Sequence, residues 1–90
     1  MKCWELLDSK NKWAHHAFAR NRDGLAVNAL EDNACQWCVL GAICVCYPNQ
    51  KENAQASNKL YNFLNTKDVG SWNDTSSYEN IFSVLKELDI

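Results

Sequence analysis

The sequence predicts a small, mainly α-helical single domain of about four helices, packed around one buried central helix at residues 34–47. Three observations lead to this prediction. The 90 residues are enough for one domain with one modest core. Three Gly and one Pro are too few for the turns of an all-β fold of this size. Finally, residues 34–47 are apolar almost throughout, and a helix that is apolar on every face belongs in the middle of a bundle.

The N-terminal third is expected to hold a short helix followed by a small hairpin. Apolar residues at helical spacing predict the helix over residues 2–9. Further along, Asp23-Gly24 lies between two short segments, and Gly adopts the positive φ of tight turns without strain. We therefore expect a hairpin or irregular loop layer near residues 17–28.

The central helix should begin after an acidic cap at residues 31–33 and end before Pro48. Gly41 lies inside it, although Gly costs about 1 kcal/mol relative to Ala within a helix. This cost is understandable if a neighbouring element needs the space. The sequence therefore predicts that another helix, or the loop around Trp72, approaches Gly41 closely.

Two further helices follow. Asn49 can cap a helix over residues 50–64, and a loop is expected at residues 65–74. Ser76 and Glu79 have the spacing of a capping box, which marks the start of the last helix. The inward positions expected for the helix at 50–64 are Ala54, Ser57, Leu60, Tyr61 and Leu64. Those expected for the last helix are Tyr78, Ile81, Phe82, Leu85 and Leu88.

The charge pattern narrows the class of partner. A net charge of −2 excludes the strongly basic footprint of a protein that coats nucleic acid, so no nucleic-acid polymer is expected as a partner. Residues 1–22 hold five basic residues against two acidic ones, which makes this part the more attractive to a small anion. We expect no signal peptide, because the first residues lack an apolar core segment, and no apolar stretch is long enough for a bilayer. We therefore expect a cytoplasmic protein without a membrane partner.

Four of the five cysteines fall in one short stretch, at Cys35, Cys38, Cys44 and Cys46. On a continuous helix they would point in different directions, so they could not converge on one metal ion. We interpret them as small apolar packing residues and expect no metal and no cofactor. Replacing Cys38 by Ser should then bury a hydroxyl without a partner. A cysteine-based metal or redox site is the weaker alternative.

No catalytic motif is present, so we expect no catalytic residue and no enzyme activity. The tryptophans suggest binding instead, because aromatic faces beside arginines and an Asn-Asp pair can stack on a base and contact a phosphate. The candidate ligand-binding residues are Trp13, His15, Arg20, Arg22, Trp72, Asn73 and Asp74. The alternative is that Trp13 and Trp72 anchor loops on the core while Asp74 caps the last helix.

Five short motifs follow one another along the chain: Lys12-Trp13, Ala17–Arg20, Asp23-Gly24, Trp37–Ile43 and Trp72–Asp74. In this order they resemble an uncharacterised family of short bacterial and bacteriophage proteins. Its members carry a W-x-x-G-A-x-A-R-D-x-x-G segment, a W-C-x-x-G-A-[LI] helix and a W-N-D loop before a terminal helix. The sequence departs from this pattern with His16 where the family often has Gly. The resemblance implies the fold and the motif boundaries, and no reaction.

The preferred functional hypothesis is the non-catalytic binding of a small anionic, nucleotide-like molecule. In a bacteriophage protein, such binding would serve to sequester a defence signal in the host cytoplasm. The alternative hypothesis is a protein–protein interaction module that inhibits a host protein. We also expect the chain to associate with itself.

Overall fold

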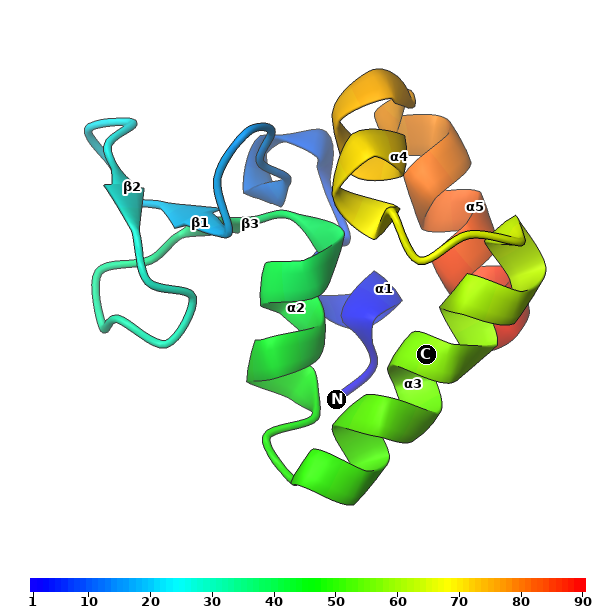
Figure 1. The fold of residues 1–90 in the computed structure, drawn as a ribbon. Helices are drawn as coiled ribbons and strands as arrows, with labels where there is room; N and C mark the ends of the chain where they lie inside the picture. The colour runs from blue at the N-terminus through cyan, green and yellow to red at the C-terminus, as the bar shows by residue number, and fades with distance from the viewer.

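Helices dominate the chain, as the low content of Gly and Pro predicts, and a small sheet accompanies them (Figure 1). The computed structural model describes all 90 residues. The helices are α1 (Cys3–Leu6), the 3-10 helix η1 (Lys10–Lys12), α2 (Val39–Cys46), α3 (Gln50–Leu64), α4 (Val69–Thr75) and α5 (Tyr78–Leu88). The strands are β1 (Ala19–Arg20), β2 (Ala26–Val27) and β3 (Gln36–Trp37). No helix combines the length and the apolar character that crossing a membrane requires.

The central helix is shorter than predicted. Residues 36–37 pair with β1 as strand β3, and α2 begins only at Val39, with Cys38 as its N-cap. The predicted start at residue 34 and the predicted acidic cap at 31–33 are therefore wrong. An apolar run that lacks periodicity does not distinguish a buried helix from a short strand that leads into one. The helix is also not buried on every side, because Cys44 is exposed.

The predicted hairpin is present. Strands β1 and β2 pair antiparallel, and Gly24 adopts a φ of 81° in the turn between them. The side chain of Asn21 accepts hydrogen bonds from the backbone N–H groups of Asp23 and Leu25, both at 3.0 Å. The third strand adds on the other side of β1, so that the order is β2-β1-β3. Figure 1 shows this sheet as a layer that projects from one end of the helical body.

The core fills the space between α1, α2, α3 and α5. Its buried residues are Cys3, Leu7, Trp13, Val39, Ala42, Ile43, Ala56, Leu60, Val69, Ile81, Val84, Leu85 and Ile90. The two ends of the chain meet at this core, where the backbone N–H of Cys3 donates to the carbonyl of Ile90. Lys2 and Asp89 form an ion pair at 3.5 Å beside that contact.

The C-terminal half departs from the prediction at three points. Residues 69–75 form α4 where a loop was expected, and Asp68 caps this helix by accepting from the N–H of Ser71 at 3.1 Å. The cap of α5 is Ser77 rather than Ser76, so the predicted capping box does not form. In α3 the predicted cap at Asn49 is confirmed, whereas Ala54 is exposed and Ala56 is buried in its place.

Candidate functional site

Trp13 and Asn73, two of the predicted ligand residues, lie inside the core. The indole N–H of Trp13 donates to Oδ1 of Asn73 at 2.8 Å, and the same oxygen accepts from the N–H of Val39 at 3.0 Å. The amide nitrogen of Asn73 donates to the carbonyl of Ala14 and to Oδ1 of Asp74, both at 3.0 Å. All four hydrogen bonds of this amide are therefore made within the chain. They join the segment after η1, the start of α2 and the helix α4.

Arg20 is engaged by the chain's own backbone. Its two terminal nitrogens donate to the carbonyls of Gly24, at 2.8 Å, and of His15, at 3.0 Å. The guanidinium thus ties the hairpin turn to the segment before β1. Arg22 is exposed and borders a different shallow hollow, beside the loop between β2 and β3.

The two remaining aromatic candidates are Trp72 and His15. Trp72 is half-buried and packs against the core. His15 is exposed, and its ring meets that of Trp13 edge-on, with 4.1 Å between centroids. Of the seven predicted residues, only Asn73 and Asp74 line the surface hollow beside β1, α2 and α4. Asp74 does not cap α5, because Ser77 holds that position.

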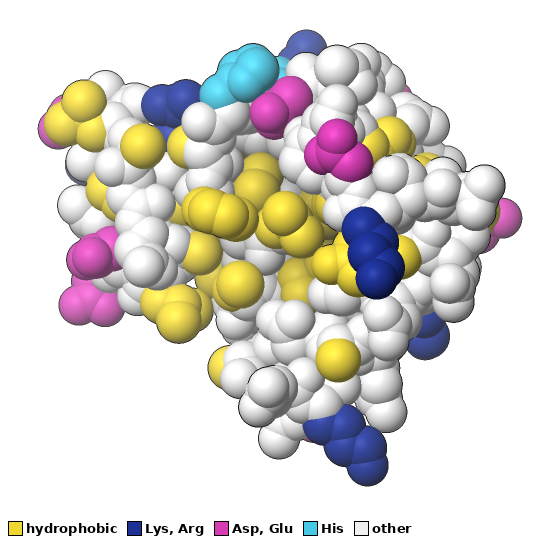
Figure 2. All heavy atoms as spheres, in the orientation of Figure 1, with side chains coloured by type: hydrophobic (Ala, Val, Ile, Leu, Met, Phe, Trp, Pro, Cys, Tyr) yellow, Lys and Arg dark blue, Asp and Glu magenta, His cyan; other side chains and the backbone are white.

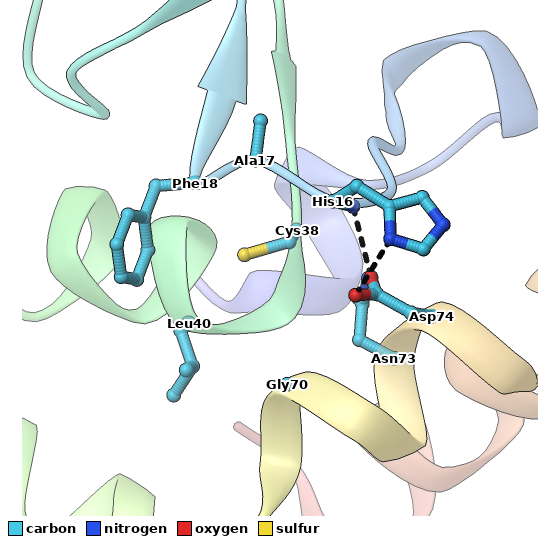
Figure 3. Close-up of a pocket in the computed structure, with 8 residues that line it drawn as sticks. All are labelled: His16, Ala17, Phe18, Cys38, Leu40, Gly70, Asn73 and Asp74. Atoms are coloured by element: carbon cyan, nitrogen blue, oxygen red, sulfur yellow. Dashed lines mark hydrogen bonds and ion pairs between the residues drawn. The ribbon is translucent and has the colours of Figure 1, made fainter.

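The hollow that Asn73 and Asp74 line lies between the segment that leads into β1, the first turn of α2, and α4 (Figure 3). Its volume is about 490 Å³. The residues that line it are His16, Ala17, Phe18, Cys38, Leu40, Gly70, Asn73 and Asp74. It is open to solvent, and one side of it is apolar while the other carries the polar groups of His16 and Asp74 (Figure 3).

His16 and Asp74 form the polar edge of this hollow. Oδ1 of Asp74 accepts from the backbone N–H of His16 at 3.0 Å, and Oδ2 lies 3.2 Å from Nδ1 of the imidazole. The backbone N–H of His16, the Asn73 amide and the neighbouring imidazoles hold the pKa of the Asp74 carboxyl below its usual value. His16 has a φ of 59°, a left-handed conformation that only a few per cent of non-glycine residues adopt.

Cys38 contributes its thiol to the other side of the hollow. As N-cap of α2, its sulfur accepts from the N–H of Gly41 at 3.3 Å. Burial raises the pKa of this thiol, so it stays protonated at neutral pH. Figure 3 shows the sulfur directed toward Phe18 and the imidazole of His16 on the opposite side, so the two groups do not form a nucleophile–base pair. No three His, Cys, Asp or Glu side chains lie close enough together to hold a metal ion.

Two of the exposed large apolar side chains, Phe18 and Leu30, lie beside this hollow. Phe18 is 61% exposed and Leu30 is 66% exposed. Phe18 also borders a second hollow of about 230 Å³, together with Leu30 and Cys44, while Leu40 lines the first. We call Phe18, Leu30, Leu40 and Cys44 the apolar belt. Figure 2 shows hydrophobic side chains that run across this face of the molecule.

Contacts with α2 and β3 hold the backbone of the segments that carry Phe18 and Leu30. The carbonyl of Phe18 accepts from the N–H of Cys38 at 3.1 Å and lies against Gly41, where a Cβ would collide with it. Beside Leu30, the indole N–H of Trp37 donates to the carbonyl of Ala29 at 3.0 Å. These contacts hold the backbone from which the side chains of Phe18 and Leu30 project. Sequence reasoning did not identify the apolar belt, because its loop residues follow no helical or strand period.

Comparison with known proteins places the chain in a family and assigns no activity. No match is found among curated proteins or among solved structures. The model of one protein family, whose function is unknown, matches residues 3–87 of the chain, which is nearly its whole length. The expectation that the chain belongs to an uncharacterised family is therefore confirmed: it is a member of DUF6197, a family of unknown function.

Proposed function

We propose that the protein is a non-catalytic protein-interaction module that binds its partner through the apolar belt. The observation that carries this proposal is that large apolar side chains are exposed on a segment whose backbone is hydrogen-bonded to the interior of the protein. Contiguous exposed apolar surface beside a hollow is typical of protein-binding sites. Because hydrogen bonds already hold the backbone at Phe18 and Ala29, ordering this backbone on binding costs little entropy.

The first hollow fits the role of a receptor for one apolar side chain. Tightly packed anchor residues in such pockets supply most of the affinity of many interfaces. Leu40 and Phe18 form the apolar wall, while His16 and Asp74 stand at the edge, where polar groups are expected in an interface. The partner is therefore expected to present an aromatic or aliphatic side chain.

The geometry favours this function over the binding of an anionic nucleotide. Arg20 and Asn73, which were expected to contact such a ligand, make their hydrogen bonds within the chain. Asp74 places a negative charge at the edge of the hollow, where it would repel a phosphate. Sequestration of a defence signal, a bacterial or bacteriophage origin and the inhibition of a host protein stay predictions.

The proposal can be tested with a photo-crosslinking amino acid placed at Phe18. The matched control places the same amino acid at Phe63, which is 47% exposed on α3 and lines neither hollow. Irradiation of cells that produce the two variants should give a discrete protein adduct from position 18 and none from position 63. Equal crosslinking at the two positions, or none at position 18, would contradict the proposal.

A further inference from the structure

We infer that the partner of the apolar belt is a second copy of this chain, packed about a two-fold axis that brings Phe18 of each protomer into the first hollow of the other. This inference rests on the proposed function, because it names the partner of the same surface. In a two-fold interface the same patch faces itself, so one patch must carry both a projecting group and a place to receive it.

The apolar belt meets this requirement. Phe18 projects with 61% of its surface exposed, and it stands directly at the rim of a hollow of about 490 Å³. An apolar cavity of about 150 Å³ is enough for a benzene molecule, so the hollow has room for a phenyl ring. Leu40 on its wall would supply the apolar contact. Projection and recess therefore lie side by side on one face.

Two loops at opposite ends of the apolar belt carry charged side chains that can pair across a two-fold axis. Figure 2 shows acidic side chains at one end of the hydrophobic surface, over the loop between β2 and β3, and a basic side chain at the other end, over the loop between α3 and α4. The first loop contains Glu31 and Asp32. The second contains Lys67 and Asp68, and the carboxylate of Asp68 caps α4 by accepting from the N–H of Ser71. Glu31, Asp32 and Lys67 are exposed, and none of the three forms an ion pair within the chain.

A two-fold rotation about the middle of the apolar belt exchanges its two ends. Glu31 and Asp32 of one protomer would then face Lys67 of the other, twice in each dimer. Complementary charges at the rim of an interface fix its register and suppress other partners. An unrelated partner would need to reproduce both the projecting ring and this charge pattern, whereas a second copy carries both.

The experiment is sedimentation velocity over a range of protein concentrations, in the presence of a reductant. The reductant prevents the exposed Cys35 and Cys44 from linking chains by a disulfide. The 10.3 kDa chain should show a reversible shift toward twice that mass as its concentration rises. Phe18→Asp should weaken this association at least tenfold, and Phe63→Asp should leave it unchanged. Circular dichroism and thermal melts show whether both variants remain folded.

A charge reversal tests the two-fold register separately and does not disturb the hollow. Changing Glu31 and Asp32 to Lys should weaken the dimer severalfold, because the two new lysines would then face Lys67 of the other protomer. Adding Lys67→Glu to that variant should restore the association. Absence of restoration would show that these loops do not face each other and would overturn the proposed arrangement.

The outcomes also separate this inference from the proposed function. A chain that stays monomeric, a dimer that the reductant abolishes, or one that ignores Phe18→Asp would overturn the inference. If such a chain still gives a discrete adduct with another protein from a crosslinker at position 18, the interaction function stands with a different partner. A monomer without any adduct would overturn both.

Discussion

Gly41 controls how closely the segment that carries Phe18 can approach α2. A Cβ at this position would collide with the carbonyl of Phe18 and would contact Cβ of Ala29 at 3.6 Å. The sequence correctly indicated that something approaches Gly41, because a glycine inside a helix needs a reason. The approaching element is the backbone before β1, and not another helix or the segment around Trp72. Periodicity cannot identify such a contact, because loop backbone leaves no pattern in the sequence.

We expect Gly41→Ala to destabilise the protein by about 1–3 kcal/mol, the usual cost of forcing an extra carbon into a packed site. This cost outweighs the gain of roughly 1 kcal/mol that Ala normally brings to a helix. The measurement is the free energy of unfolding in urea. Gly70→Ala is the matched control, because nothing lies within 4 Å of a Cβ at that position in α4. Gly70→Ala should be neutral or slightly stabilising, and equal stability of the two variants would refute the contact.

His16 and Asn73 show where the chemistry of single residues could and could not be predicted. The resemblance led us to expect Gly at the position of His16, and His16 takes a left-handed φ, a conformation that Gly adopts without strain. Asn73 was identified as a functional residue from its motif. The structure gives it four internal hydrogen bonds, which link segments about 60 residues apart in the sequence. No local rule reveals partners so distant.

At the scale of elements, the boundary between β3 and α2 was the main error. Both elements lie in one apolar run, and the strand exists only because β1 is there to pair with it. Helices with polar and apolar faces, such as α3 and α5, were predicted nearly to the residue. The helix α4 was missed because its seven residues are too few to show a period. Elements that depend on a distant partner or are very short are thus the ones that sequence patterns fail to predict.

The revised boundary changes the expected effect of Cys38→Ser. A hydroxyl inside the helix would have been buried without a partner, but Cys38 is the N-cap, and its sulfur already accepts from the N–H of Gly41. Ser is among the preferred N-cap residues. We therefore expect Cys38→Ser to leave the free energy of unfolding unchanged or raised, and Cys38→Ala to lower it by about 1 kcal/mol. Cys44→Ser, at an exposed site, serves as the neutral control in the same denaturation assay.

At the scale of the whole molecule, the prediction of a mostly helical fold was correct in kind. Composition and helical periodicity depend on many residues at once. A single misplaced helix boundary therefore does not change the fold class that they predict. The apolar belt could not be predicted in this way, because Phe18 and Leu30 are apolar residues like those of the core. Only the complete packing decides which apolar side chains remain outside. Surfaces of this kind are properties of the assembled chain rather than of any segment.

The closure of the two chain ends is a second property of the assembled molecule. Ile90 is 2% exposed, and its carbonyl accepts from the N–H of Cys3 and, at 2.9 Å, from the hydroxyl of Tyr47. Burial and the neighbouring thiols and carboxylates raise the pKa of Tyr47 to about 12, so this hydroxyl remains a donor across the ordinary pH range. Terminal residues are usually mobile unless such contacts hold them.

Ile90→Ala removes the buried side chain and keeps both hydrogen bonds to the backbone. We expect it to lower the free energy of unfolding by about 2 kcal/mol, near the lower end of the range for Ile→Ala in a core, because a residue outside the helices can relax into the space. Urea denaturation measures the loss, and Glu87→Ala, at an exposed position on α5, is the control. A loss no larger than that of Glu87→Ala would mean that the segment after α5 frays and that α1 closes the core without it.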